Sequence, residues 1–405
     1  MHKNNSAAGE QHSVEVQDIF IRYGAAYRMN HGRQLSVQQL KAMRSIELCR
    51  TAILGGHVEQ CDSCGEVRIS YNSCRNRHCP KCQFLKKEKW LEDRLKDFLP
   101  GIQYFHVVFT IPHGLNPLTL RNKTVVYNIL FQSASETLKE LSLDKKHLGA
   151  LPGFICVLHT WGQNLMDHYH MHCIVTGGGL TDDNQRWISS RNGFFIHVDV
   201  LSKLFRGKFL YYLRESYNNG ELQFPGNISY LQEKNKFQLL LNGLYQKEWV
   251  VYSKPPFKSP ETVFKYLAGY THRIAISNHR IIKIEDDNVH FKWRDYADSN
   301  KQKIMALDVF EFIRRFLLHV LPIKFVKIRY YGLFANRKRK VLLGNCRKIM
   351  GISFVAHKEN VESWQEMLLR ITGVDIEKCH HCGKGKMLPV ETFLPVNCNS
   401  PPGEF

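Results

Sequence analysis

Long apolar segments are missing from this chain of 405 residues. No apolar run follows Met1, and the longest apolar patches, such as FLLHVLPI at 316–323, are soon interrupted. A helix that crosses a bilayer needs roughly 20 apolar residues in succession, so we expect neither a membrane span nor a secretory leader. Repeats and low-complexity tracts are also missing, while 43% of the residues are apolar. We therefore expect a cytoplasmic globular protein of two or three domains.

Acidic residues are scarce. The sequence has 37 Asp and Glu against 56 Lys and Arg, which gives a formal net charge of +19. Such an excess favours a polyanionic partner, with nucleic acid first and an acidic membrane surface second. A soluble protein that is merely basic is the simpler alternative.

Two common phosphate-handling motifs are also absent. The sequence has no Walker-type glycine loop and no convincing carboxylate cluster for a two-metal nuclease. Twelve cysteines are present, and in a reducing compartment they indicate metal sites or plain burial before disulfides. Cysteine, histidine and tyrosine are therefore the residues on which a functional hypothesis has to rest.

The order of the expected elements indicates an α+β fold. A strand over 104–112 is followed by a helix over 124–141, two strands over 153–161 and 169–179, and a mostly helical segment over 187–258. This order is typical of a ferredoxin-like domain with an antiparallel sheet. Residues 286–288 read as the turn of a later hairpin, which a basic helical tail follows.

A cysteine-rich segment precedes the expected sheet. Cys61 and Cys64 form one CxxC pair, Cys79 and Cys82 form another, and 14 residues separate the pairs. Two such turns can direct four thiolates at one Zn²⁺, so the spacing predicts a structural zinc site. Cys74 or His78 could replace one of the four ligands or complete a second site. The simpler alternative is a set of buried or unpaired cysteines.

A weaker signal lies near the end of the chain. Cys379 and Cys382 form a single CxxC pair without an obvious partner, although Cys346 or Cys398 could supply a further ligand. We interpret this segment as a candidate second zinc knuckle followed by a loose tail.

Histidines alternate along the second expected strand of the central pair. Side chains two positions apart share a face of a strand, so His170 and His172 point together. His159 on the neighbouring strand is the expected third ligand of a divalent metal, and His168 is the competing one. Manganese, cobalt, nickel or zinc suits imidazole, and magnesium suits a site that phosphate oxygens complete. A histidine satisfied within the core is the alternative for any one of them.

Two tyrosines follow at helical spacing. In KYLAGYTHR, Tyr266 and Tyr270 are four residues apart and would share one face of a helix. Each phenol could attack a phosphodiester that a nearby metal polarises. Two tyrosines packed in the core at this spacing are the alternative.

These motifs together resemble a known family. The sequence His170-Met171-His172 fits the HUH pattern of two histidines around a hydrophobic residue, and a YxxxY pair follows downstream. With the segments GGHVEQCDSCG, YNSCRNRHCPKCQ, HVVFTIPHGLNPL and YLAGYTHRIAISNHRI, the chain resembles two-tyrosine HUH rolling-circle transposases of the insertion-sequence 91 type. The resemblance extends in order from about residue 35 to about residue 385.

The resemblance implies a mechanism. The protein would bind mobile-element ends as single-stranded or hairpin DNA, and Tyr266 or Tyr270 would form a 5′-phosphotyrosine link that leaves a 3′-hydroxyl. The second tyrosine would act on the target or on the other end, with Mg²⁺ or Mn²⁺ at the histidines. Such a protein would work in the cytoplasm, at the bacterial nucleoid.

The resemblance also implies a division of the chain. We expect a flexible arm at 1–35, a helical zinc-binding and DNA-binding domain at 36–98, an HUH tyrosine endonuclease domain at 99–295, and a basic C-terminal region at 296–405. The residues expected to contact DNA are basic: Arg75, Arg77, Lys81, Arg273, Arg280, Arg337, Lys338, Arg339 and Lys340. An ordinary solvated surface is the alternative for each of them.

Three other functions are compatible with parts of this pattern. A replication initiator or conjugative relaxase would use the same HUH chemistry, but the zinc segment argues against it. A zinc-finger protein that only binds DNA would not need the two tyrosines. A zinc hydrolase would use the three histidines but would leave the charge of +19 unexplained.

Overall fold

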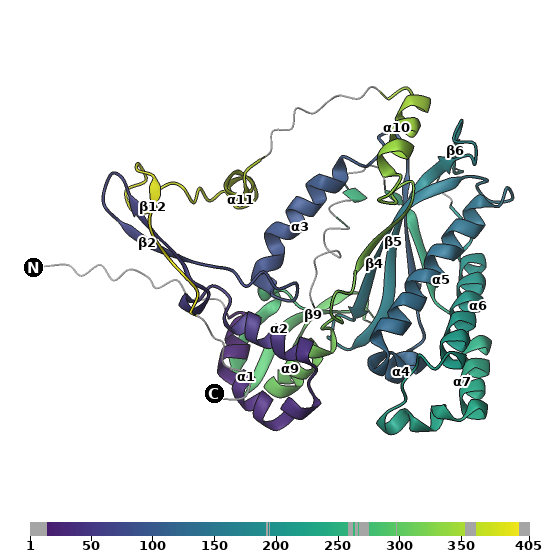
Figure 1. Ribbon diagram of the computed structural model, residues 1–405, viewed down its shortest axis with the longest axis horizontal. Coiled ribbons are helices and arrows are strands. Elements are labelled where there is room, and N and C mark those ends of the chain that lie inside the picture. Colours follow the sequence, from purple (N-terminus) through teal and green to yellow (C-terminus); the bar gives the residue numbers. More distant parts are fainter. Residues whose placement is uncertain are drawn as a thin grey trace, which may run out of the picture.

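The computed structural model describes residues 14–191, 193, 195–257, 262, 263, 266, 275–296, 298–352 and 362–396. Figure 1 shows a large sheet with α5 and α6 on one side, a helical bundle at the N-terminal end, and a small ribbon that stands apart from both. The ribbon is a sheet of three strands. Helix α3 (Pro80–Leu95) lies between the ribbon and the large sheet.

The large sheet has the predicted ferredoxin-like arrangement. Its order is β11-β4-β5-β3-β7, and all the pairings are antiparallel. Helix α5 follows the first strand in the chain and α6 follows the third, which gives the βαββαβ order that the sequence indicates. The bounds are β3 Tyr104–Thr110, α5 Lys123–Leu143, β4 Leu151–Trp161, β5 Asp167–Leu180, β6 Trp187–Ser189, α6 Val198–Asn218, α7 Lys234–Gln246, β7 Val251–Phe257 and β11 Ile328–Gly332.

The two faces of this sheet have different roles. Phe154, Cys156 and Leu158 of β4 point into the main core beneath α5 and α6. Ile155 and Val157 point to the other face, where α10 (Arg339–Ile349) contributes to a smaller core. Because side chains alternate along a strand, His159 lies on this second face.

The predicted flexible arm is wrong for residues 16–31. They form helix α1 (Val16–His31), which packs on α2 (Val37–Glu47) because Val16, Ile19 and Phe20 are buried at helical spacing. Ser36 caps the N-terminus of α2, since its side chain accepts a hydrogen bond from the Gln39 amide.

The N-terminal bundle also contains a later part of the chain. Helix α9 (Val309–Leu318) packs against α1, with the rings of Phe20 and Phe316 5.3 Å apart. The predicted hairpin precedes it, and its turn uses Asp286 and Asp287, which both have positive φ. The strands are β8 Ile281–Glu285, β9 Asn288–Asp295 and β10 Lys301–Asp308.

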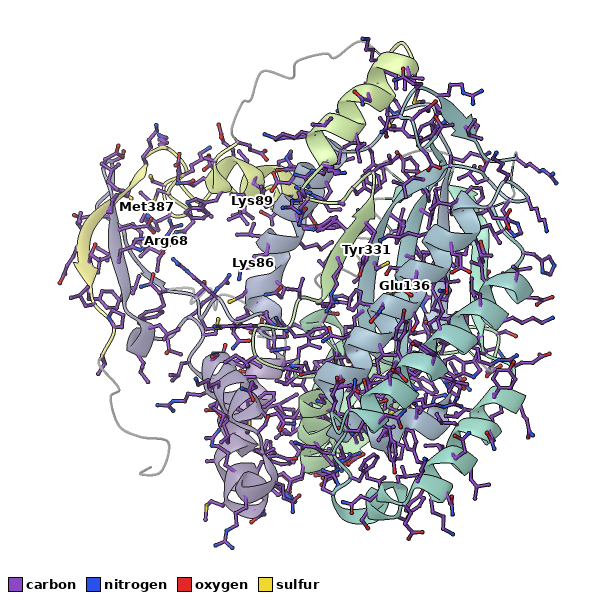
Figure 2. All side chains as sticks on the ribbon, turned by 45° about the vertical axis from the view of Figure 1, so that its right-hand side comes forward. Arg68, Lys86, Lys89, Glu136, Tyr331 and Met387 are labelled. Carbon is purple, nitrogen blue, oxygen red and sulfur yellow. The ribbon has the colours of Figure 1, made fainter. Side chains whose placement is uncertain are left out.

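The ribbon joins a segment from the N-terminal part of the chain to one from the C-terminal part. Strand β1 (Gly56–Cys61) pairs with β2 (Val67–Tyr71) on one side and with the C-terminal β12 (Met387–Phe393) on the other. The predicted loose tail is therefore wrong for residues 387–393, because β12 satisfies its backbone groups on β1. Figure 2 shows Met387 and Arg68 on this ribbon.

The remaining elements are short. Helix α11 (Trp364–Thr372) precedes the second CxxC pair and is tied to α3, because Arg370 forms an ion pair with Glu92. The others are α4 Asn116–Arg121 and the 3-10 helices η1 Gly32–Gln34, η2 Ala52–Leu54, η3 His113–Leu115, η4 Gly226–Gln232 and η5 Asn278–Arg280.

Candidate functional site

Three histidines meet on the second face of the large sheet. The antiparallel register places His159 of β4 directly opposite His170 of β5. His172 lies two positions along β5 and shares that face. All three residues are buried, and one ring nitrogen of each lies within 4.8 Å of the others. The structure thus brings His159, and not His168, to the HUH pair.

Hydrogen bonding and burial prepare these rings to bind a cation. His170 Nδ1 lies 2.8 Å from the His168 carbonyl oxygen and donates to it, so Nε2 carries the lone pair of the neutral ring. Burial lowers the pKa of His170 to about 3 and also holds the pKa of His172 well below its usual value. Neutral imidazoles are metal ligands, so the three residues fit a divalent metal site.

The competing ligand His168 has other neighbours. Its ring packs on His170 at 4.7 Å and on His113 at 5.4 Å between centroids. The backbone carbonyl of His168 accepts the hydrogen bond from His170 Nδ1. His168 therefore contributes to the site by orienting the His170 ring.

A fourth histidine, His106, was not predicted from the sequence and forms a hydrogen bond with His172. His106 Nε2 lies 2.8 Å from His172 Nδ1, and the two rings stack 5.0 Å apart. Burial lowers the pKa of His106 to about 3. Its hydrogen bond fixes which nitrogen His172 can turn toward a metal. The available signal was a single histidine within the otherwise apolar run of strand 104–110.

Tyr266 lies next to this histidine pair. Its ring meets His106 edge to face at 4.9 Å, and Lys254 Nζ donates to its phenol oxygen at 3.1 Å. Residues 262, 263 and 266 are helical, as predicted for this segment. Tyr270 and Arg273 lie outside the described residues. Lys254 was also missed, although it is the one charged residue of the strand sequence VYSKPPF.

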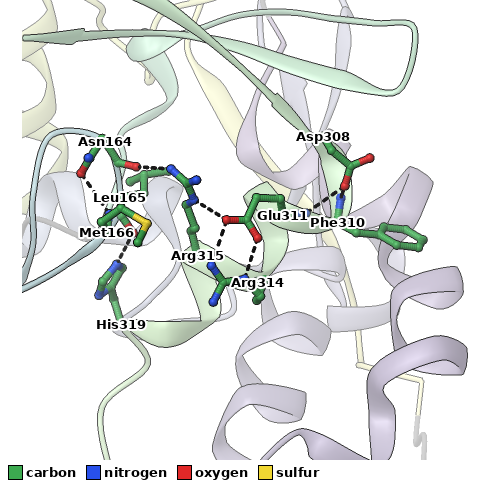
Figure 3. Close-up of polar contacts among 9 residues, drawn as sticks. All are labelled: Asn164, Leu165, Met166, Asp308, Phe310, Glu311, Arg314, Arg315 and His319. Atoms are coloured by element: carbon green, nitrogen blue, oxygen red, sulfur yellow. Dashed lines mark hydrogen bonds and ion pairs between the residues drawn. The ribbon is translucent and has the colours of Figure 1, made fainter. Parts of the chain in front are cut away.

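The loop between β4 and β5 is clamped through three consecutive carbonyls. Arg280 donates to the Gln163 oxygen at 2.6 Å, Arg315 to the Asn164 oxygen at 3.0 Å, and His319 to the Leu165 oxygen at 2.9 Å. Figure 3 shows the last two contacts, with Arg315 also paired to Glu311 of α9. The N-terminal bundle therefore fixes the loop that separates His159 from His170.

The cysteines are divided differently from the prediction. Cys79 and Cys82 at the start of α3 meet Cys49 and Cys74, whereas Cys61 and Cys64 in the ribbon meet the distant pair at 379 and 382. The predicted single site of Cys61, Cys64, Cys79 and Cys82 is wrong, because the two CxxC pairs fold into separate parts of the chain. Cys49, two residues after the end of α2, was not predicted as a ligand.

The other predicted cysteine partners and histidines lie elsewhere. Cys346 is a buried residue of α10, and Cys398 is outside the described residues. The predicted alternative ligand His78 accepts a hydrogen bond from the Leu321 amide at 3.4 Å. Cys74, the other alternative, does join the cluster around Cys49.

The predicted basic residues fall into two groups. Four of them make internal contacts: Arg77 donates to the Phe325 carbonyl, Lys81 pairs with Glu15, Arg280 holds the loop, and Arg339 pairs with Asp97. Arg77 is also exposed, and so are the remaining four described residues, Arg75, Arg337, Lys338 and Lys340.

A cationic cavity of about 440 Å³ opens beside the histidine site. Its wall includes Trp161, whose ring stacks on His159 at 4.6 Å and contacts Lys327 Nζ 5.1 Å from its centroid. Among the described residues that line it, none is acidic, and the cations are Arg77, Lys86, Lys324 and Lys327. Burial lowers the pKa of Lys327 to about 7. This wall is suited to an anion.

Comparisons with known proteins agree with this architecture. Residues 153–341 match the family model described as "Putative transposase", and residues 19–111 match "Transposase zinc-binding domain". The chain is 49% identical over 381 residues to "Putative transposase y4qJ" of Sinorhizobium fredii, covering 94% of this chain and 95% of that protein. It is 27% identical over 312 residues to "Transposase for insertion sequence element IS801" of Pseudomonas savastanoi pv. phaseolicola, covering 75% and 72%. No solved structure matches.

The α+β sheet domain, the cysteine clusters and the two matched models define a transposase with a zinc-binding domain. The chain belongs to the IS91-type family of transposases, proteins that act on DNA. Within the part of the chain that the structure describes, no helix is long and apolar enough to cross a membrane.

Proposed function

We propose that this transposase nicks and rejoins single-stranded DNA at the ends of a mobile element through a 5′-phosphotyrosine intermediate on Tyr266. The observation that carries the proposal is the position of the Tyr266 phenol, which contacts His106 beside the His159, His170 and His172 group. The proposed nucleophile thus lies beside the candidate metal site, and the cationic cavity adjoins that site through Trp161, whose ring stacks on His159.

The candidate metal is Mg²⁺ or Mn²⁺. His159, His170 and His172 would hold it, and the hydrogen bonds at Nδ1 of His170 and of His172 would orient the Nε2 atoms of these two rings toward it. When bound, such an ion supplies a positive charge that stabilises negative charge developing on a phosphodiester. The group consists of three histidines and contains no carboxylate. Phosphate oxygens of the DNA could therefore supply the oxygen ligands that Mg²⁺ and Mn²⁺ prefer.

The chain's own residues supply the nucleophile and its surroundings. The Tyr266 oxygen attacks the phosphorus, loses its proton, and forms the O–P bond, while the bond from phosphorus to the 3′ oxygen breaks. The departing oxygen takes up a proton and becomes a 3′-hydroxyl. Lys254, which donates to the Tyr266 oxygen, would stabilise the phenolate as it forms.

The second tyrosine completes the cycle. The link to Tyr266 conserves the free energy of the phosphodiester, so rejoining requires no nucleotide cofactor. In this proposal Tyr270 accepts the other end or the target strand, and a free 3′-hydroxyl reverses each link.

The cationic cavity suggests how a strand is held. A phosphate of the incoming strand would bind among Arg77, Lys324 and Lys327, next to the Trp161 ring that packs on His159. The exposed residues Arg337, Lys338 and Lys340 would add less specific contacts, and the same kind of contact would favour DNA of the nucleoid.

The proposal is tested with purified protein and single-stranded oligonucleotides that carry the element ends, with Mn²⁺ or Mg²⁺ added. We expect a covalent protein–DNA species on a denaturing gel that requires the metal. Tyr266→Phe and His170→Ala should abolish it, whereas Tyr245→Phe, which changes an exposed tyrosine on α7, should not. DNA binding without any covalent species in the wild type would contradict the proposal.

A further inference from the structure

The zinc-binding family model ends at residue 111, but one of the cysteine clusters does not. Cys61 and Cys64 lie within the matched segment, and the cysteines that they meet, Cys379 and Cys382, lie more than 250 residues beyond it. The Cys61 and Cys382 sulfurs belong to residues 321 positions apart, and those of Cys64 and Cys379 to residues 315 positions apart. The cluster therefore joins segments that no single matched domain contains.

The sulfur positions fit a tetrahedral metal site. Both closest sulfur–sulfur distances across the cluster are 3.7 Å. A Zn–S bond of about 2.3 Å gives a tetrahedron with an edge of about 3.8 Å. A disulfide requires a sulfur–sulfur distance of about 2.05 Å, so the arrangement is that of thiolates around a cation.

The two CxxC turns repeat one geometry. In each turn the residue after the second cysteine is a glycine with positive φ, +77° at Gly65 and +64° at Gly383. The Gly65 amide donates to the Cys61 carbonyl, and the Gly383 amide donates to the Cys379 carbonyl. Such turns place two sulfurs on one side of the backbone, where they can share an ion.

Backbone amides also point at the sulfurs. The Ser63 amide lies 3.4 Å from the Cys61 sulfur, and the Gly385 amide lies 3.4 Å from the Cys382 sulfur. These donors would stabilise thiolate charge on the metal. A Cβ atom at Gly385 would overlap the Cys61 sulfur, so this close approach of the two turns requires glycine.

Strand pairing continues from the cluster. Cys61 is the register partner of Met387, and the Asp62 amide donates to the Lys386 carbonyl at 3.0 Å. The return bond runs from the Lys386 amide to the Asp62 side chain at 2.9 Å. The pairing of β12 with β1 thus begins at the cysteines.

We propose that Cys61, Cys64, Cys379 and Cys382 bind a second zinc ion, separate from an ion at Cys49, Cys74, Cys79 and Cys82, and that it fastens the C-terminal strand β12 to the N-terminal ribbon. Binding converts four thiols into zinc-bound thiolates and releases their protons to solvent. His381, with Nδ1 3.9 Å from the Cys64 sulfur, is a neighbour of a ligand set that is complete without it.

The first test measures the zinc content of the full-length chain by inductively coupled plasma mass spectrometry. The protein is purified without added metal. We expect two zinc ions per wild-type chain and one in Cys379→Ser/Cys382→Ser. The double variant Cys79→Ser/Cys82→Ser should lose the other ion, and Cys346→Ser, a change at a buried cysteine outside both clusters, should keep two. His381→Ala should also keep two.

Retention of one zinc ion in Cys379→Ser/Cys382→Ser also shows that the N-terminal cluster is still folded. The proposal is overturned if this variant keeps two zinc ions. It is also overturned if the wild type and the variant each hold one zinc ion, because the change at Cys379 and Cys382 would then have removed none. A wild type in which intact mass shows disulfides and no zinc at these cysteines would overturn it equally. None of these counts involves DNA, so they stand or fall separately from the phosphotyrosine proposal.

Hydrogen exchange measures the fastening itself. Backbone amides of β12 (Met387–Phe393) should exchange slowly in the zinc-loaded protein and at least 10-fold faster in Cys379→Ser/Cys382→Ser, while amides of β4 remain unchanged. Equal protection of β12 in both proteins would show that strand pairing alone holds this segment, and would contradict the proposed role of the ion.

Discussion

Lys254 is the residue whose role is most directly open to measurement. Its ammonium donates to the Tyr266 oxygen at 3.1 Å. A donor that stabilises an oxyanion typically contributes on the order of 10²–10³ to a rate, so Lys254→Met should slow covalent adduct formation by about 10- to 100-fold. The rate of the variant should also continue to rise to higher pH, because its phenol ionises less readily.

The control for Lys254 is a lysine with no such contact. Lys247→Met removes an exposed cation from the end of α7 and should leave the rate unchanged. Metal affinity at the histidines should be the same in all three proteins. A Lys254→Met enzyme with the wild-type rate and pH profile would show that the lysine only packs on the ring.

His319 gives a pH prediction. Burial lowers its pKa to about 3 from an ordinary value of 6.5. The unfolded chain therefore binds a proton first as the pH falls, and the stability contributed by the neutral ring is lost between about pH 6.5 and pH 3. The loss can reach about 1.4 kcal/mol per pH unit for one group.

Urea unfolding at several pH values would measure this slope. In His319→Gln, the free energy of unfolding should depend less steeply on pH between 4 and 6 than in the wild type. His197→Gln changes an exposed histidine and should keep the wild-type slope. An unchanged slope in His319→Gln would mean that His319 titrates normally in the folded protein.

At the scale of elements, the contacts that hold the β4–β5 loop distinguish two neighbouring arginines of α9. Arg314 and Arg315 both bind Glu311, but only Arg315 also donates to the Asn164 carbonyl. A hydrogen bond from a charged donor contributes about 1.5–3 kcal/mol, whereas an exposed ion pair contributes about 0–1 kcal/mol. Arg315→Ala should therefore destabilise the protein by about 2 kcal/mol and weaken Mn²⁺ binding at the histidines.

Arg314→Ala is the matched control, since it removes the same charge and a bond to the same carboxylate. Its unfolding midpoint and its Mn²⁺ affinity, measured by calorimetry, should stay close to wild type. Equal losses in both variants would assign the effect to Glu311 and α9, and not to the loop.

The elements of the sheet could be predicted because their signals are local. The alternation in YHMHCIV placed His170 and His172 on one face, and the order of strands and helices indicated the ferredoxin-like arrangement. His106 and Lys254 could not be assigned, because their roles depend on which strands lie next to β5 and on where Tyr266 is placed. Each is one polar residue in a strand, a pattern that core packing also produces.

At the scale of the whole molecule, the predictions from the sequence were wrong where segments far apart in the chain meet in the fold. Two nearby CxxC pairs suggest one site, but each pair found its partners elsewhere: one at Cys49 and Cys74, the other more than 300 positions away. For the same reason the contiguous domains expected from the sequence do not describe the packing. Helix α9 belongs to the N-terminal bundle, β11 to the large sheet, and β12 to the ribbon.

The net charge of +19 predicts strong salt dependence of DNA binding. Each phosphate contact on a single strand contributes about 0.7 to the slope of log K against log salt concentration. The triple variant Arg337→Ala, Lys338→Ala, Lys340→Ala should reduce that slope by about 2 in a fluorescence titration.

A control of equal charge comes from the far side of the helical layer. Replacing Lys234, Lys236 and Lys247 on and beside α7 with alanine removes the same three charges from exposed positions. This variant should retain the wild-type slope. Equal reductions in both variants would indicate that only the total charge matters. They would contradict the proposal that Arg337, Lys338 and Lys340 contact DNA.

The phosphotyrosine mechanism is tested most directly by identifying the amino acid that becomes joined to DNA. A single-stranded oligonucleotide carrying an element end would be incubated with the full-length protein and Mn²⁺, and the adduct would be digested with protease and nuclease and mapped by tandem mass spectrometry. We expect a 5′-phosphorylated nucleotide on the oxygen of Tyr266, together with a released strand that ends in a 3′-hydroxyl. A nucleotide on Tyr270 without one on Tyr266, a nucleotide on a residue other than these two, or cleavage with no covalent nucleotide on any tyrosine would contradict the proposal.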